Sequence, residues 1–385
     1  MATTIAALVG TVRENSSTEY GSTQEPFSEI TTNYAYWDYS NISDDELGRC
    51  VYDSHPAHYL PALYSVFFIV GLLGNTLVIW VIVCGARLRS MTDVCLLNLA
   101  FADLLLVCSF PFLAHQARDQ WLFGDGMCKA VLGAYYIGFY SGIFFITLMS
   151  IDRYLAIVHA VYALRARTRS FGILAATVTW VAAITASFPD LSFLEVQESR
   201  RKDGEMYKFC APLYSKPGTL APGRHFWSVF SLFKMNVLGL LIPMAIMGFC
   251  YTHIIRRLLC SQSSKKQAIR LVLVVVAVFF CCWVPYNVTS LFKALELLHP
   301  YAECSSSKAI RRAIQATEAV AYSHSCLNPV LYVFVGERFR RHLVRLVKRS
   351  PCRLCQIMKT FIPQDRINGS VYSQTTSVDE RSTAV

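Results

Sequence analysis

Four ionisable side chains lie within long apolar stretches of this chain. Asp103 and Glu318 each stand among hydrophobic residues, and Asp152 and Arg153 are adjacent near the end of another apolar stretch. A charged group in apolar surroundings is costly unless it is paired, so such residues mark functional positions by default. The chemistry that they offer is recognition and switching, because a carboxylate can meet a cationic ligand and an adjacent acid and base can pair or separate.

Two of these positions allow more than one interpretation. Asp103 is either a polar switch that acts with Asn75 and Asn328, or a structural hub of hydrogen bonds. Arg153 either extends to the membrane interface, or is restrained by Asp152 in an element with two states. Proline residues inside the apolar stretches, Pro285 among them, favour kinked helices that can pivot.

The apolar stretches are long enough to cross a membrane. Hydrophobic residues make up 54% of the 385 residues, charged residues make up 16%, and the mean hydropathy is +0.37. About 20 apolar residues cross the hydrocarbon core as a helix. The sequence therefore predicts an all-α membrane protein, a bundle of seven transmembrane helices. The expected spans are 59–83, 94–114, 130–157, 173–189, 229–255, 269–295 and 313–335.

Lysine and arginine residues indicate the orientation of this bundle. They are concentrated in the loops after the first, third and fifth spans and after the seventh span, and basic loops stay in the cytoplasm. The N-terminus is therefore predicted outside and the C-terminus inside. We expect an extracellular acidic arm, the bundle, a short amphipathic eighth helix on the membrane surface and a cytoplasmic Ser/Thr-rich tail, over residues 1–58, 59–335, 336–350 and 351–385 respectively.

Four of the fourteen cysteines fall at the predicted extracellular face, where disulfides form. They are Cys50, Cys128, Cys210 and Cys304. Four cysteines allow three pairings, and the sequence alone does not choose among them. The predicted topology favours Cys128 with Cys210, which would tie the second outer loop to the third span. It also favours Cys50 with Cys304, which would tie the arm to the loop before the seventh span.

Other short motifs agree with this sidedness. Glycosylation sequons begin at Asn15 and Asn41 in the predicted arm. The second outer loop contains Asp203-Gly204, a dipeptide typical of two-residue hairpin turns, between segments that can form strands. We therefore expect a β-hairpin in that outer loop.

Several other classes of protein lack support in the sequence. It contains no nucleotide-binding glycine loop, no His-Glu-x-x-His motif and no credible nucleophile with a base, so we expect neither an enzyme nor a cofactor or metal. A transporter usually has halves related by an internal repeat, and none is visible. A retinal protein would need a lysine in the seventh span, and residues 313–335 contain none.

The motifs themselves resemble those of rhodopsin-like G-protein-coupled receptors. The matching stretches are Gly74-Asn75, "LNLAFAD" ending at Asp103, "DRYLAIVHAV" at 152–161, Trp180, Pro243, "CWVPYN" at 282–287 and "NPVLY" at 328–332. More narrowly, "SFPF", "QATE" ending at Glu318 and "CLNPVLYVFVGERFRRHL" resemble CC chemokine receptors. The stretch "FKMNVLGLLIP" is most similar to types 4 and 8 of that family.

This resemblance implies a ligand and a binding mode. Chemokines are small basic proteins, and an acidic arm with sulfatable tyrosines would attract them electrostatically. The arm residues implied are Tyr34, Tyr36, Asp38 and Tyr39. The N-terminus of the chemokine would then enter the bundle, where Glu318 would meet a cationic group. Tyr64, Tyr135 and Tyr286 would form the aromatic walls of this pocket.

The resemblance also implies how a signal crosses the membrane. In the family, the inner end of span six moves outward and Arg153 meets a G protein of the inhibitory class, which leads to chemotaxis and calcium signalling. Trp283 and Pro285 would form the pivot, and Tyr251 and Tyr332 would support the open form. Asp103, Asn328 and Asp152 would take part in the switch.

The remaining expectations concern the tail and an alternative. Cys352 and Cys355 are expected to be palmitoylated, and tail phosphorylation by receptor kinases would recruit arrestin. The expected location is the plasma membrane, in contact with lipids and with no nucleic acid. The alternative function is an atypical receptor that removes chemokines through arrestin without a G protein.

Overall fold

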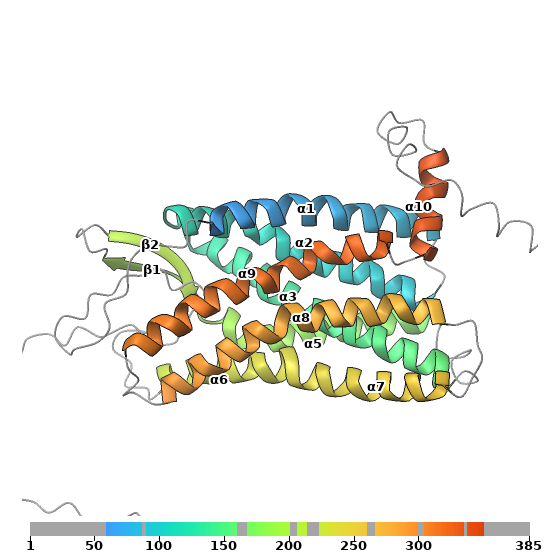
Figure 1. Ribbon diagram of the computed structural model, residues 1–385. Coiled ribbons are helices and arrows are strands. Elements are labelled where there is room, and N and C mark those ends of the chain that lie inside the picture. The colour runs from blue at the N-terminus through green and yellow to red at the C-terminus, as the bar shows by residue number, and fades with distance from the viewer. Residues whose placement is uncertain are drawn as a thin grey trace, which may run out of the picture. The chain divides into compact units, whose positions relative to one another are not determined.

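The computed structural model describes residues 59–86, 90–159, 168–200, 206–213, 223–259, 266–298, 304–334 and 337–349. These residues form long helices and one two-stranded sheet (Figure 1). The elements are α1 (Leu60–Val81), η1 (Ile82–Ala86), α2 (Met91–Arg118), α3 (Gly124–Val158), α5 (Arg169–Leu191), β1 (Leu194–Arg200), β2 (Met206–Pro212), α6 (Gly223–Asn236), η2 (Val237–Leu241), α7 (Ile242–Leu259), α8 (Lys266–Leu298), α9 (Cys304–Phe334) and α10 (Glu337–Arg349), of which η1 and η2 are π-helical.

Six stretches of helix within the described ranges are long and apolar enough to cross a membrane, and they coincide with the first six predicted spans. They are Leu60–Gly85, Met91–Arg118, Gly124–Val158, Arg169–Leu191, Phe226–Arg257 and Leu273–Leu298. The predicted seventh span falls within α9, which packs along α1 and α8. The helix α9 is less apolar than these six stretches because it carries Lys308, Arg311 and Arg312 before the predicted span and Glu318 within it.

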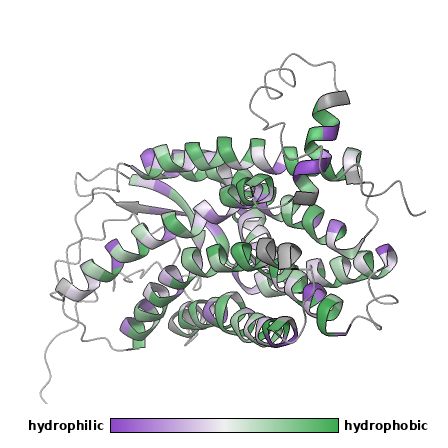
Figure 2. Cartoon of the chain, turned by 45° about the vertical axis from the view of Figure 1, so that its right-hand side comes forward, coloured by the Kyte–Doolittle hydropathy of each residue, from purple (hydrophilic) through white to green (hydrophobic). Residues whose placement is uncertain are grey.

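The long helices lie side by side, with the sheet at one end of the bundle and α10 at the other (Figure 1). We refer to these as the hairpin end and the α10 end. Hydrophobic residues line the helices along most of their length (Figure 2). Many large apolar side chains point outward, including Leu73, Leu174 and Val178, each at least 60% exposed. Such a surface is stable in lipid and not in water.

The bundle is centred on α3, which packs against α2, α5 and α7. Its close approach to α2 depends on a glycine. A Cβ atom added at Gly138 would lie 2.8 Å from the Ala102 carbonyl oxygen and 2.8 Å from the Leu106 amide nitrogen. Backbone atoms cannot give way as flexible side chains can, so this contact requires glycine.

Helix ends in the bundle follow local rules. The Ser90 hydroxyl accepts a hydrogen bond from the Asp93 amide, and the Asp93 carboxylate accepts one from the Ser90 amide. This capping box satisfies free amides at the start of α2. The helix therefore begins at Met91 and not at the predicted residue 94, because a capped polar turn precedes the apolar run.

The π-helical segment η2 ends at Leu241, two residues before Pro243. Proline has no amide hydrogen and its ring collides with the preceding turn, so regular hydrogen bonding is disturbed there. A single wider turn accommodates this disturbance. The sequence analysis predicted no π-helix.

The predicted hairpin is confirmed. Strands β1 and β2 pair in antiparallel register, with Leu194 opposite Pro212 and Val196 opposite Cys210. Cys210 forms a disulfide with Cys128 at the start of α3, as the predicted topology favoured. The predicted turn at Asp203-Gly204 lies outside the described residues.

The hairpin is also tied to the end of α2. Gln116 accepts a hydrogen bond from the Cys210 amide at 2.9 Å, and the Trp121 amide donates to the Lys208 carbonyl at 2.7 Å. Trp121 itself is buried. The disulfide and these bonds fix the sheet over the hairpin end of α2 and α3.

The expected amphipathic eighth helix is α10. Its buried face consists of Phe339, Leu343, Val344 and Val347. This face packs near η1 and α9, while Arg341 and Arg345 are exposed. A helix with one apolar and one basic face is suited to lie on an anionic membrane surface.

Candidate functional site

A buried carboxylate lies near the hairpin end of the bundle, on α9. Glu318 is 2% exposed, and its Oε1 atom accepts a hydrogen bond from the Tyr322 hydroxyl at 2.7 Å. The two residues are one helical turn apart, so α9 itself brings them together. The Tyr322 hydroxyl also lies 3.5 Å from that of Tyr135 on α3.

Aromatic rings from several helices pack around Tyr322, the hydrogen-bond partner of this carboxylate. We refer to Tyr64, Tyr135, Tyr286 and Tyr322 as the tyrosine cage. Tyr322 packs against Tyr64 of α1, Phe110 of α2 and Tyr135 of α3, with ring centroids 5.9, 5.1 and 6.0 Å apart. Tyr286 of α8 is buried and interacts electrostatically with Glu318. The structure therefore brings together the four residues predicted to form a pocket. Aromatic faces around a carboxylate offer a cation both a charge partner and π surfaces.

Asp103 lies buried in the middle of the bundle. Its Oδ2 atom accepts a hydrogen bond from the Asn328 side chain of α9 at 2.9 Å. The Asn75 side chain of α1 donates to the backbone carbonyls of Gly71 and Ser325, each at 3.0 Å. Asp103 and Asn328 are thus in direct contact, and Asn75 joins α1 to α9 through the backbone.

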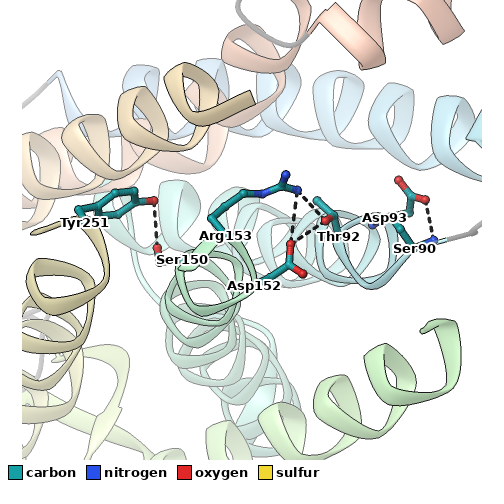
Figure 3. A network of polar contacts seen from close by, with 7 residues as sticks. All are labelled: Ser90, Thr92, Asp93, Ser150, Asp152, Arg153 and Tyr251. Carbon is teal, nitrogen blue, oxygen red and sulfur yellow. Dashed lines mark hydrogen bonds and ion pairs between the residues drawn. The ribbon is translucent and has the colours of Figure 1, made fainter. Parts of the chain in front are cut away.

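A second polar network lies near the α10 end (Figure 3). The Arg153 guanidinium is 3.4 Å from the Asp152 carboxylate and donates a 2.6 Å hydrogen bond to the Thr92 hydroxyl. Thr92 in turn donates to Asp152 at 2.7 Å. The Asp152 side chain is fully buried and that of Arg153 is 13% exposed. Arg153 therefore contacts both Asp152 and Thr92 and does not simply extend toward the interface.

The other residues predicted for switching lie between these two networks. Trp283 is buried, with ring centroids 4.8 Å from Phe139 and 6.1 Å from Tyr286. Pro285 lies inside α8, two residues beyond it.

Two tyrosines lie closer to the α10 end. The Tyr251 and Ser150 hydroxyls are 3.3 Å apart, which links α7 to α3. Tyr332 is buried, and its ring packs 6.1 Å from that of Phe339 in α10.

The structure also contains a buried ion pair that the sequence analysis did not single out. The Lys234 ammonium of α6 bonds to the Asp190 carboxylate of α5, and their side chains are 7% and 1% exposed. The Ser231 hydroxyl bonds to the other carboxylate oxygen. Lys234 lies within "FKMNVLGLLIP", one of the stretches that carry the resemblance, but nothing in that stretch indicates its partner on α5, so only the tertiary structure reveals this pair.

Other predicted site residues lie outside the described part of the chain. They are Asn15, Tyr34, Tyr36, Asp38, Tyr39, Asn41, Cys50, Cys352, Cys355 and the side chain of Cys304. The Cys50–Cys304 disulfide, the sulfation, glycosylation and palmitoylation sites and the arm remain predictions. Among the described residues, no group of three or more His, Cys, Asp or Glu side chains could hold a metal ion.

Comparison with known proteins agrees with this architecture. Residues 74–332 match the family described as "7 transmembrane receptor (rhodopsin family)". The C-C chemokine receptor type 4 of Homo sapiens is 44% identical over 309 residues, which cover 79% of this chain and 83% of that receptor. The C-C chemokine receptor type 8 of Mus musculus is 46% identical over 293 residues, covering 76% and 80% respectively. The chain belongs to the rhodopsin family of seven-transmembrane receptors and, within it, to the C-C chemokine receptors.

Three important side chains were missed by sequence reasoning. Tyr322 binds Glu318, Thr92 binds both Asp152 and Arg153, and Lys234 binds Asp190. For Tyr322 a signal was present, because it follows Glu318 by four residues and must share its helix face. For Thr92 and Lys234, the partners lie far away in the sequence, and no local pattern indicates them.

Proposed function

We propose that this protein is a plasma-membrane receptor for CC chemokines that activates a heterotrimeric G protein of the inhibitory class. The observation that supports this most is the buried carboxylate of Glu318 within the tyrosine cage at the hairpin end. This pocket suits the cationic N-terminus of a basic protein ligand. Two relatives that are 44% and 46% identical to this chain over the aligned residues are named as chemokine receptors.

Ligand capture begins at the extracellular arm. Chemokines are basic, whereas the arm places Tyr34, Tyr36 and Tyr39 beside Asp38 and other acids. Complementary charge raises the association rate, and sulfation of the tyrosines would strengthen it. The arm then holds the folded body of the chemokine while its N-terminus reaches Glu318.

The response is a shift between two populations. The chemokine must bind the signalling conformation more tightly than the silent one. We assign the described arrangement, in which Arg153 contacts Asp152 and Thr92, to the silent conformation. Rearrangement around Trp283 and Pro285 releases Arg153 to meet the G protein, while Tyr251 and Tyr332 support the open form. Calcium signalling and chemotaxis follow from G-protein activation.

The tail regulates this response. Phosphorylation of its Ser and Thr residues by receptor kinases adds the negative charge that arrestin recognises. Palmitoylation of Cys352 and Cys355 would anchor the chain after α10. The basic face of α10 supports contact with anionic lipids of the inner leaflet.

The test is suppression of cyclic AMP in cells that express the receptor and are challenged with a panel of CC chemokines, with and without pertussis toxin. We expect a toxin-sensitive response to one or a few chemokines. An Arg153→Ala variant at equal surface abundance should bind chemokine but lose the response. Uptake of chemokine without any G-protein signal would favour the atypical scavenging receptor, and the absence of binding would refute the proposal.

A further inference from the structure

The buried contact between Lys234, Asp190 and Ser231, here named the Lys234 cluster, lies where α6 faces the end of α5. Besides Asp190, the Lys234 ammonium donates to the Ala186 carbonyl at 2.8 Å and lies 5.4 Å from the centre of the Tyr140 ring on α3. An ammonium group has three donors. The Asp190 carboxylate oxygen, the Ala186 carbonyl oxygen and the face of the Tyr140 ring account for all three donors.

Each charge in the Lys234 cluster depends on the other. Asp190 lies in the last turn of α5, where the helix dipole disfavours a carboxylate. A lone ion in a membrane bundle is costly, and the removal of one partner leaves the other buried and uncompensated. The presence of a buried ion pair does not by itself show that it stabilises the fold. It does favour the one arrangement of α5 and α6 in which the two charges meet.

The position of α6 relative to α5 depends on the Lys234 cluster. Among the described residues, the backbone of α6 packs along α8, where the Asn236 side chain donates to the Ser290 hydroxyl at 2.9 Å. The backbones of α6 and α5 make few close approaches. Long side chains span the gap: the Lys234 cluster, and the rings of Phe193 and Trp227, whose centroids are 5.4 Å apart.

The Lys234 cluster also lies next to the predicted pivot. Tyr140, under the ammonium, is adjacent to Phe139, whose ring contacts Trp283 at 4.8 Å. Phe139 also contacts Gly239 of η2, since a Cβ atom added there would lie 3.2 Å from its ring. A movement of α6 relative to α5 would therefore change the contacts of Tyr140, Phe139 and Trp283.

We infer that Lys234 and Asp190 are positioning residues that hold α6 against α5 and α3 and pass ligand-induced movement to Trp283. This inference rests on the proposed function for its signalling part. Capture of a chemokine by the arm does not need the Lys234 cluster, whereas activation does. Loss of the ion pair should consequently separate binding from signalling.

The decisive variant removes both charges at nearly constant volume: Lys234→Met with Asp190→Asn. The purified receptor is tested in nanodiscs with the CC chemokine that stimulates the unmodified receptor most strongly. We expect binding within about threefold of the unmodified receptor, but a concentration for half-maximal nucleotide exchange raised about tenfold or more, a change of ~1.4 kcal/mol. Thr185→Val is the control, because the exposed Thr185 hydroxyl of α5 bonds only to its own helix.

A second measurement does not depend on any chemokine. Spin labels carried by unnatural amino acids at Phe188 of α5 and Phe226 of α6, which are 64% and 59% exposed, report the separation of the two helices. We expect a narrow distance distribution in the unmodified receptor and a broad one in the doubly substituted variant. If no CC chemokine binds the unmodified receptor, the proposed function fails, while this measurement still decides whether the cluster positions α6.

Two results would overturn the inference. One is a nucleotide-exchange response within threefold of the unmodified receptor in the doubly substituted variant. The other is an unchanged distance distribution. If that variant does not reach the membrane, Asp190→Glu keeps the charge and shifts it by one methylene group, and the same measurements and limits apply.

Discussion

At the scale of single residues, the two polar networks depend on hydroxyl groups that contact charged partners. Tyr322 donates to Glu318 near the hairpin end, and Thr92 bridges Asp152 and Arg153 near the α10 end. A hydrogen bond to a charged group contributes about 1.5–3 kcal/mol. The loss of one oxygen atom should therefore be measurable in each network.

Tyr322→Phe should lower the potency of the chemokine about tenfold, because Glu318 loses the donor that orients its carboxylate and stabilises its charge. The ring and its packing are retained. Potency is measured by nucleotide exchange at matched surface abundance. In a Glu318→Gln background the same substitution should have a much smaller effect, because the amide oxygen still accepts the hydrogen bond but carries no charge, and this double-mutant cycle isolates the interaction. Additive effects in that cycle would count against the contact.

Thr92→Val should raise nucleotide exchange without ligand by about 3- to 10-fold, because Arg153 loses its hydrogen bond to the Thr92 hydroxyl. The measurement is basal exchange in membranes with added G protein. Thr177→Val is the matched control, as Thr177 is exposed and bonds to the Ile173 carbonyl of its own helix at 3.1 Å. Basal exchange equal in the two variants would contradict the restraint of Arg153.

At the scale of secondary-structure elements, the bundle depends on close approach of α2 and α3. Gly138 allows this approach, because a Cβ atom there would collide with backbone atoms of α2 at 2.8 Å. Interhelical contact through small residues is a common way for helices to associate in membranes. By contrast, nothing lies within 4 Å of a Cβ atom added at Gly248 of α7.

Gly138→Ala should lower the stability of the solubilised receptor by about 1–3 kcal/mol, since the two helices must move apart. Gly248→Ala should leave stability unchanged or raise it by up to ~1 kcal/mol, because alanine favours the helix and meets open space. Thermal unfolding of the purified protein measures both. The opposite order of melting temperatures would refute this account of the α2–α3 contact.

At the scale of the whole molecule, the proposed function requires that two distant sites communicate. The tyrosine cage lies at the hairpin end, and the Arg153 network lies near the α10 end. Coupling between two binding sites is reciprocal by thermodynamic necessity. Between them, Trp283, Phe139 and Tyr286 share one buried cluster with Tyr251 and Tyr332, while Tyr64, Tyr135 and Tyr322 lie in a second buried cluster nearer the hairpin end.

Bound G protein should raise the affinity for the chemokine, and bound chemokine should raise the affinity for G protein. The two factors should be equal and should fall within the typical range of about 5- to 150-fold. Both constants are measured on the receptor in nanodiscs without nucleotide. Arg153→Ala should bring both factors close to one. Two clearly different factors in the unmodified receptor would show that the two ends do not share one two-state equilibrium.

The sequence by itself determined the elements and their order. Apolar runs of membrane-spanning length predicted the helices. Ser90 stands at the start of α2, Pro285 lies inside α8, and Gly138 lies where α3 approaches α2. Family motifs indicated Asp103, Arg153, Trp283 and Asn328. These features are local, since they depend on hydrophobicity along the chain and on residue spacing within one helix.

Only the tertiary structure decided which side chains meet. The Lys234–Asp190 pair, the bridge from Thr92 to Arg153 and the pairing of Cys128 with Cys210 join residues 44, 61 and 82 positions apart. Helix rotation and tilt fix these contacts, and both depend on packing between helices and not on the composition of any one of them. The π-helical turn before Pro243 is a further example, because its hydrogen bonding is a compromise between proline geometry and the packing of Gly239 against Phe139.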